Sequence, residues 1–362
     1  MPFLWHIGGL SMIYKANEQI YKYVLIKNIG GGNFGEVWLA NDISLDNQCA
    51  LKLLPKEDTS IDERLLEAQI GNRLQHNNLV NIKYADVVQY GSPPKPIVMI
   101  AMPFFKNGSI LSQLNSCNFL PTNLAIKCLI DVLRGLEYLH ESGYYHCDIK
   151  PNNILVGDHG EYVLSDYGIT CYSPTHTAVQ PRQCYLPHVS PETLRQNTYD
   201  IRTDIYQLGL TAFRLFNGIS EISNRFLANR TAFNDSVLNG RVVTDNMYQP
   251  FVPKKIRKII SKAIALNPND RYQSALEMRR ALEQISLKGF CTSDVHGNTI
   301  FVSGGKEFRF AVTPLTDKTS RFLAYQKNLT SGRETKAHKY CCTEIKNSEI
   351  KKQIQKMTID FL

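Results

Sequence analysis

Residues 146–153 read HCDIKPNN, and thirteen positions beyond Asn153 residues 166–168 read DYG. An aspartate that can accept a proton, an asparagine and a second aspartate that can hold a divalent metal ion, and a nearby lysine form a set suited to phosphoryl transfer. Any one of these residues can stand in a loop by chance. Their order and spacing together argue against chance.

A glycine-rich stretch lies far upstream. Residues 30–37 read GGGNFGEV and follow a predicted strand. Glycines let the backbone approach phosphate oxygens closely, although such a stretch alone is more often a plain turn. A dinucleotide-binding fold would need a helix next. Residues 37–40 read VWLA, which favours a second strand instead.

A lysine follows 17 positions after Gly35, at the end of a predicted strand that contains Ala50, Leu51 and Lys52. A lone lysine there is usually just solvated. Glu67, on the next predicted helix, offers it a carboxylate, and a fixed Lys–Glu pair would place an ammonium on phosphates.

Together these motifs resemble the eukaryotic-type (Hanks-type) protein kinase family over roughly residues 21–285. The resemblance implies an α+β, two-lobed fold with ATP bound in the cleft between the lobes. It implies Asp148 as the catalytic base, Lys150 as a phosphate contact, and Lys52 held by Glu67 on the α/β-phosphates. Asn153 and Asp166 would hold Mg²⁺, with Mn²⁺ as a substitute.

The resemblance also implies which residues surround the nucleotide. They comprise the loop glycines, residues against adenine, and the gatekeeper and hinge: Gly30, Gly32, Gly35, Val37, Ala50, Lys52, Met102, Pro103, Phe105 and Leu155. Supporting residues follow in the same way. Residues 190–192 match the end of the activation segment, Arg271 is the expected partner of Glu192, and Asp204 opens a helix that supports the catalytic loop.

Three positions depart from the family pattern, and the mildest is Tyr167, which stands where phenylalanine is usual and keeps the ring. Cys147 replaces the arginine that usually precedes the catalytic aspartate, so a phosphorylated activation loop would lack its docking partner. Tyr185 stands where a serine/threonine-specific threonine is usual. Serine/threonine specificity then rests mainly on Lys150 and Pro151, and dual specificity stays open.

Two other classes compete with an active protein kinase. A pseudokinase scaffold should lack a catalytic part, whereas the set above is complete. A small-molecule kinase of the aminoglycoside or choline type shares two aspartates and an asparagine. The full glycine loop, Lys150 and residues 190–192 favour the protein-directed branch.

Four regions are expected: a leader (1–20), a strand-rich lobe (21–106), a mainly helical lobe (107–286) and a basic extension of unknown role (287–362). Ser60 and Glu63 fit a capping box that opens the one helix of the strand-rich lobe. In the extension, residues 299–302 and 308–312 are typical of a hairpin, and residues 348–361 of a basic helix.

Composition restricts the class of protein and its expected location in the cell. Of 362 residues, 43% are hydrophobic and 20% are charged, which excludes a disordered chain or a coiled coil. Nine cysteines without a CxxC pair indicate reduced thiols, and His338, Cys341 and Cys342 lack a fourth zinc ligand. The longest apolar run, residues 96–105, is too short to span a membrane, and the N-terminus lacks a basic signal region. We therefore expect a cytoplasmic protein that acts on protein substrates away from membranes.

The positive charge is uneven. The chain carries a net +8, and residues 287–362 hold 13 Lys and Arg against 7 Asp and Glu. Any acidic partner, nucleic acid included, would bind this extension. A solvated basic face is the commoner meaning of such a surplus, and we favour it.

Overall fold

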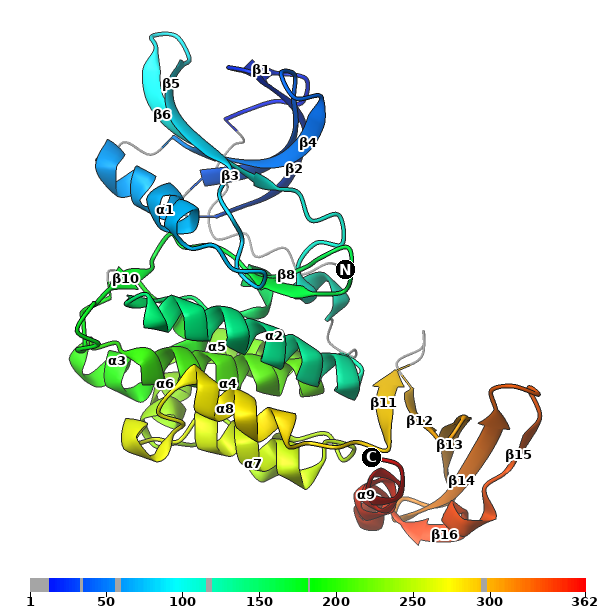
Figure 1. The fold of residues 1–362 in the computed structure, drawn as a ribbon. Helices are drawn as coiled ribbons and strands as arrows, with labels where there is room; N and C mark the ends of the chain where they lie inside the picture. The colour runs from blue at the N-terminus through cyan, green and yellow to red at the C-terminus, as the bar shows by residue number, and fades with distance from the viewer. Residues whose placement is uncertain (1–12, 33–34, 56–59, 115–118, 182, 294–297) are drawn as a thin grey trace. The chain divides into compact units, whose positions relative to one another are not determined.

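The computed structural model describes residues 13–32, 35–55, 60–114, 119–181, 183–293 and 298–362 (Figure 1). Most of the expected leader and two loop residues, Asn33 and Phe34, lie outside these ranges. Contacts divide the chain into two units. Unit 1 comprises Met1–Lys106 and Asp166–Gly168, and unit 2 comprises Asn107–Ser165 and Ile169–Leu362.

The described residues of unit 1 form an antiparallel six-stranded sheet and one helix, α1 (Ile61–Arg73). The strand order is β1-β2-β3-β4-β6-β5. Its strands are β1 (Gln19–Ile20), β2 (Tyr23–Gly32), β3 (Gly35–Asp42), β4 (Asn47–Leu54), β5 (Tyr84–Tyr90) and β6 (Lys95–Pro103). Alternate residues of a strand face opposite sides of a sheet. Leu51 and Met99 accordingly join one apolar cluster, while Leu54 and Val98 join a second that includes α1.

The start of α1 follows the predicted cap. The Ser60 hydroxyl accepts a hydrogen bond from the Glu63 backbone N–H at 3.2 Å. Further along, a Cβ on Gly71 would lie 2.3 Å from the Ile82 side chain and 3.2 Å from the Tyr167 ring. Glycine therefore lets the helix approach residues 166–168, which are remote in sequence.

Unit 2 is mainly helical. The α-helices that precede the extension are α2 (Thr122–Glu141), α3 (Pro191–Gln196), α4 (Ile201–Asn217), α5 (Ser220–Ala228), α6 (Arg230–Leu238), α7 (Lys254–Ala263) and α8 (Ala275–Glu283). Residues 203–216 of α4 are all buried, so α4 is the central helix, and α2 and α7 pack on it. The strand-rich first part and helical second part confirm the expected α+β kinase-like fold.

Unit 2 also contains short strands and 3₁₀ turns. Two-stranded sheets form from β7 (Tyr144–Tyr145) with β10 (Cys171–Tyr172), and from β8 (Ile154–Val156) with β9 (Tyr162–Leu164). The 3₁₀ turns are η1 (Ile110–Gln113), η2 (Pro151–Asn153), η3 (Leu186–His188), η4 (Asp245–Met247), η5 (Pro268–Asp270), η6 (His338–Tyr340) and η7 (Asn347–Glu349).

The basic extension forms a sheet and a helix of its own. Its elements are β11 (Gly289–Ser293), β12 (Thr299–Ser303), β13 (Lys306–Pro314), β14 (Thr319–Asn328), β15 (Glu334–Lys336), β16 (Cys342–Lys346) and α9 (Ile350–Phe361). The expected hairpin is β12–β13, with Gly304 and Gly305 both at positive φ in a two-residue turn. The remaining strands were not predicted.

The extension is bonded to the helical region of unit 2. The Cys291 backbone N–H donates to the Thr122 hydroxyl of α2 at 3.0 Å, and the Thr358 hydroxyl of α9 donates to the Pro250 carbonyl at 3.5 Å. Inside the extension, the Phe361 ring stacks on Phe308 with centroids 3.9 Å apart. Strand β11 and helix α9 thus both contact the helical region.

The apolar pattern of residues 254–266 predicts a helix over that whole range, and the observed helix is shorter. Helix α7 ends at Ala263, whereas the apolar pattern extends to Leu266. The carbonyl oxygens of Ala265 and Leu266 instead accept hydrogen bonds from the buried Arg271 side chain. In the parts of the chain that the structure describes, no helix combines the length and apolarity that crossing a membrane requires.

Candidate active site

Lys52 is the centre of a buried charged cluster in unit 1. Its ammonium lies 2.8 and 2.7 Å from the two carboxylate oxygens of Glu67 and 3.0 Å from Asp166 Oδ1. Burial alone would lower the pKa of Lys52. The negative charges of Asp166 and Glu67 outweigh burial and hold that pKa above its ordinary value. The ammonium therefore stays charged at neutral pH.

Residues 166–168 reach this cluster because they are anchored to unit 1. The Tyr167 hydroxyl donates to the Val80 carbonyl at 3.0 Å, and its ring is buried. A Cβ on Gly168 would lie 3.3 Å from Asp166 Oδ1 and 3.4 Å from Glu67 Oε2. Glycine there leaves the Asp166 and Glu67 carboxylates uncrowded.

The expected nucleotide residues of unit 1 lie along β2, β3, β4 and β6. Gly35 has φ of 150°, and a Cβ there would lie 2.0 Å from the Leu53 carbonyl oxygen, so only glycine fits. Among the described residues, no atom lies within 4 Å of a Cβ built on Gly30. The ladder pairs Val37 with Lys52 and Ala50 with Met102.

Gly32 and Pro103 are the last residues of β2 and β6, and Phe105 follows in the loop. The structure therefore places these unit 1 residues on neighbouring strands and the loop beyond them. Leu155, the expected floor under adenine, belongs to β8 of unit 2.

Helix α4 holds the catalytic loop of unit 2, residues 146–153. The Asp204 carboxylate accepts backbone N–H bonds from His146 at 2.8 Å and Cys147 at 2.9 Å. Burial alone would raise the pKa of Asp204, but hydrogen bonds from His140 and Tyr199 help to hold that pKa below its usual range. Asp204 is thus an ionised anchor for the loop, in the place that the sequence predicted.

A second anchor, Gln207, was not predicted. Its side-chain oxygen accepts the Ile149 N–H at 2.8 Å, and its side-chain nitrogen donates to the Cys147 carbonyl at 3.0 Å. Residues three apart lie on one face of a helix. The spacing from Asp204 was therefore the only available signal for Gln207.

Asp148 is buried, and its two carboxylate oxygens differ. Oδ2 accepts hydrogen bonds from the Lys150 ammonium at 2.7 Å and the Asn153 side-chain nitrogen at 2.9 Å. Oδ1 is also buried, yet it has no hydrogen-bond partner among the described residues. A buried acceptor without a partner is costly. The arrangement suits a hydroxyl donor brought by another molecule.

The two expected metal ligands belong to different units. The side-chain NH₂ group of Asn153 donates hydrogen bonds to Asp148, so the side-chain oxygen of Asn153 is left to bind a cation. Asp166 contributes a carboxylate. Among the described residues, no group of three or more His, Cys, Asp or Glu side chains could hold a metal by itself. Mg²⁺ usually takes only one or two oxygen ligands from the protein and completes its coordination shell with water and substrate phosphates. Two oxygen-bearing side chains are therefore compatible with Mg²⁺.

Cys147 lies in an apolar pocket of unit 2. Its side chain is fully buried in a cluster with Tyr145 and Tyr199, against which Ile169 and Cys171 pack. Burial raises the pKa of Cys147 well above its ordinary value. Position 147 therefore presents a neutral thiol in apolar surroundings.

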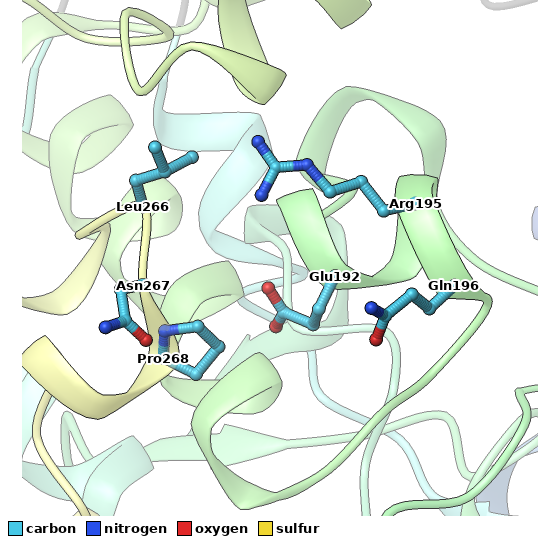
Figure 2. Close-up of a pocket in the computed structure, with 6 residues that line it drawn as sticks. All are labelled: Glu192, Arg195, Gln196, Leu266, Asn267 and Pro268. Carbon is cyan, nitrogen blue, oxygen red and sulfur yellow. The ribbon is translucent and has the colours of Figure 1, made fainter.

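The expected ion pair between Glu192 and Arg271 is present, with two contacts of 2.8 Å. A cavity of about 320 Å³ lies beside Glu192, and Figure 2 draws the side chains that line it. Six residues line the cavity: Glu192, Arg195, Gln196, Leu266, Asn267 and Pro268. Neither Asp148 nor Lys150 is among them, so we assign the cavity no part in the chemistry.

Comparison with known proteins agrees with this geometry. The family model described as "Protein kinase domain" matches residues 23–284. The serine/threonine-protein kinase PrkC of Bacillus subtilis is 25% identical over 327 residues, which are 88% of this chain and 48% of that protein.

Two further relatives cover the same region. The serine/threonine-protein kinase PknB of Mycolicibacterium smegmatis is 28% identical over 73% of this chain and 43% of its own length. An Aurora kinase of Eremothecium gossypii is 24% identical over 73% of this chain and 70% of its own. The chain thus spans less than half the length of the two bacterial relatives. Because the family model covers both the Lys52 cluster and the Asp148 loop, the chain belongs to the protein kinase domain family.

Proposed function

We propose that the chain is an ATP-dependent protein kinase that transfers the γ-phosphoryl group to serine or threonine hydroxyls of protein substrates. The observation that carries this proposal is the asymmetry of Asp148. One oxygen accepts hydrogen bonds from Lys150 and Asn153, while the other is buried and has no partner in the part of the chain that the structure describes. The names of the bacterial relatives support serine/threonine specificity.

In the proposed reaction, Asp148 Oδ1 accepts the hydrogen bond of the acceptor hydroxyl and orients its oxygen. That oxygen forms a bond to the γ-phosphorus as the bond to the β-phosphate oxygen breaks. ADP leaves, and the hydroxyl proton passes to Asp148. Lys150 contacts the transferring group, and Lys52 contacts the α/β-phosphates.

Asn153 and Asp166 would hold Mg²⁺, or Mn²⁺ in its place, which neutralises charge on the phosphates when bound. The glycines at 30, 32 and 35 would cover the phosphates. Val37, Ala50, Met102, Pro103, Phe105 and Leu155 would contact adenine or its edge. The eight described cysteines are free thiols, which supports a reducing, cytoplasmic setting.

The test measures transfer from radiolabelled ATP to generic protein substrates. Asp148→Ala should lower the initial rate by about 10²- to 10⁴-fold, because the acceptor hydroxyl loses its base. Asp158→Ala is the matched control, since it removes an exposed carboxylate ten residues away.

Each alternative gives a different result. An equal rate for wild type and Asp148→Ala would refute the proposal. ATP binding without any transfer would indicate a pseudokinase scaffold. Transfer to choline or an aminoglycoside, with no labelled protein, would indicate a small-molecule kinase.

A further inference from the structure

Lys150 is held from two sides in unit 2. Its ammonium lies 2.7 Å from Asp148 Oδ2 and 4.6 Å from the centre of the Tyr185 ring. A lysine side chain is long and flexible, so one contact alone leaves its ammonium several positions. A cation over an aromatic face is attracted by the negative face of the ring. The Tyr185 ring therefore adds a second contact to the one with Asp148.

The Tyr185 ring is itself positioned by the interior of unit 2. It packs edge-on against His188, with centroids 5.2 Å apart and planes at 69°. His188 is fully buried. Its Nδ1 lies 2.9 Å from the Ile149 carbonyl, and its Nε2 lies 3.0 Å from an Arg214 guanidinium nitrogen.

These contacts define the state of His188. Nδ1 carries the proton and donates to the carbonyl, while Nε2 accepts from Arg214. Burial, together with the charge of Arg214, lowers the pKa of His188 well below its ordinary value. A neutral ring locked by two hydrogen bonds is a rigid support for Tyr185. The support begins on α4, the helix that also anchors the catalytic loop.

We propose that Tyr185 is a positioning residue for phosphoryl transfer, and that its ring face holds the Lys150 ammonium beside Asp148. The proposal rests on the proposed kinase function. The family's threonine at this position offers a hydroxyl and no ring face. In this chain position 185 offers an aromatic face instead, and Tyr185 affects phosphoryl transfer by holding Lys150.

The test varies the electron density of the ring while its shape stays nearly constant. Phenylalanine and its fluorinated analogues, introduced at position 185, weaken the negative ring face stepwise. We expect Tyr185→Phe to keep kcat within about twofold, and kcat to fall steadily with each added fluorine. Tyr185→Leu should lower kcat by about 3- to 30-fold, the range expected for a cation–π contact. The KM for the protein substrate should stay constant. Thermal unfolding of each variant checks that it is folded.

A double-mutant cycle completes the test. In a Lys150→Ala background, Tyr185→Leu should change kcat by less than twofold, because the group that the ring holds is absent. A flat fluorine series, or a full additional loss in the Lys150→Ala background, would overturn the proposal. A wild-type protein that shows no transfer dependent on Asp148 would overturn the kinase function instead, so the two failures are distinguishable.

Discussion

Unit 1 and unit 2 each contain a buried cluster in which a lysine contacts a carboxylate, and the two clusters differ in how completely their polar atoms are paired. In unit 1, the Lys52 ammonium contacts both Glu67 and Asp166, so a buried cation is surrounded by compensating charge. In unit 2, Lys150 and Asn153 satisfy only Oδ2 of Asp148, and Oδ1 has no partner among the described residues. The first cluster fixes a positive charge. The second keeps a buried acceptor for an incoming donor.

This difference predicts unequal effects on the free energy of unfolding. Removing one partner of a buried ion pair leaves an uncompensated charge, which is strongly destabilising. Removing an acceptor that has no partner costs little or even stabilises the fold. Substitutions that each abolish phosphoryl transfer should therefore differ in their effect on the free energy of unfolding.

The largest expected effect contrasts Lys52→Met with Asp148→Asn. Both should abolish or nearly abolish transfer. Lys52→Met should also lower the free energy of unfolding by up to about 3 kcal/mol, since Glu67 and Asp166 lose their cation. Asp148→Asn should lower that free energy by less, about 1 kcal/mol, because it breaks the ion pair with Lys150 but removes a carboxylate whose Oδ1 has no partner among the described residues. Urea denaturation and initial rates check both expectations.

Lys22→Met is the control for this contrast. Lys22 pairs with Asp42 at 2.9 Å in the same unit but is more exposed than Lys52. Its loss should cost at most about 1 kcal/mol and leave the rate unchanged. Equal destabilisation by Lys52→Met and Asp148→Asn would mean that the two clusters do not differ as described.

The next effect concerns pH, because unit 2 also depends on a group that must stay uncharged. His188 has a lowered pKa in the fold, so below about pH 6.5 the unfolded chain binds a proton that the folded chain does not. Above about pH 6.5 His188 is neutral in both states and does not change the free energy of unfolding, and below that pH protonation of the unfolded chain lowers it. The free energy of unfolding should therefore decline by up to about 1.4 kcal/mol per pH unit below 6.5.

Urea denaturation at pH 7.5, 6.5 and 5.5 measures this decline, and His188→Gln is the matched variant. The glutamine cannot take up a proton, so its curve should lack the His188 share of the slope. Parallel curves for wild type and His188→Gln would show that another group titrates.

A further effect on stability concerns the extension. Ending the chain at Leu287 should leave a folded protein that binds ATP, because every proposed site residue lies before that position. The lost bonds to Thr122 and Pro250 should still cost about 1–3 kcal/mol of stability, or roughly 2–4 °C in Tm per kcal/mol. Differential scanning calorimetry with and without ATP measures this. An insoluble or inactive product would instead make the extension part of the enzyme.

The smallest expected effect is on activation. We propose that the kinase is not switched on by phosphorylation of its activation segment, because position 147 holds a buried thiol in an apolar cluster. Of four hydroxyl residues there, Thr170 and Ser173 are buried and bond backbone oxygens, while Thr175 and Thr177 are exposed. Changing Thr175 and Thr177 to alanine therefore avoids a structural defect.

Initial rates of this double variant and the wild type are compared after phosphatase treatment, and again after incubation with ATP. We expect less than a tenfold difference, or about 1.4 kcal/mol of barrier, in both states. A larger drop that appears only when the wild type has been rephosphorylated would contradict the proposal.

The sequence by itself determined the parts whose chemistry is local in the chain. The order and spacing of residues 146–153 and 166–168 indicated the family, and the family model confirms it. The Ser60 cap and the β12–β13 hairpin were predictable because each depends on neighbouring residues and backbone geometry. The Glu192–Arg271 pair followed from the family resemblance.

Only the tertiary structure decided which distant groups satisfy one another. It brought Gln207 of α4 to the backbone of the catalytic loop and the Tyr185 ring to Lys150, and it joined the extension to α2. It also left Asp148 Oδ1 buried with no hydrogen-bond partner from any described residue. No local pattern encodes these outcomes, because a hydrogen bond or cation–π contact depends on a few tenths of an ångström between segments. Packing of the whole unit sets those distances.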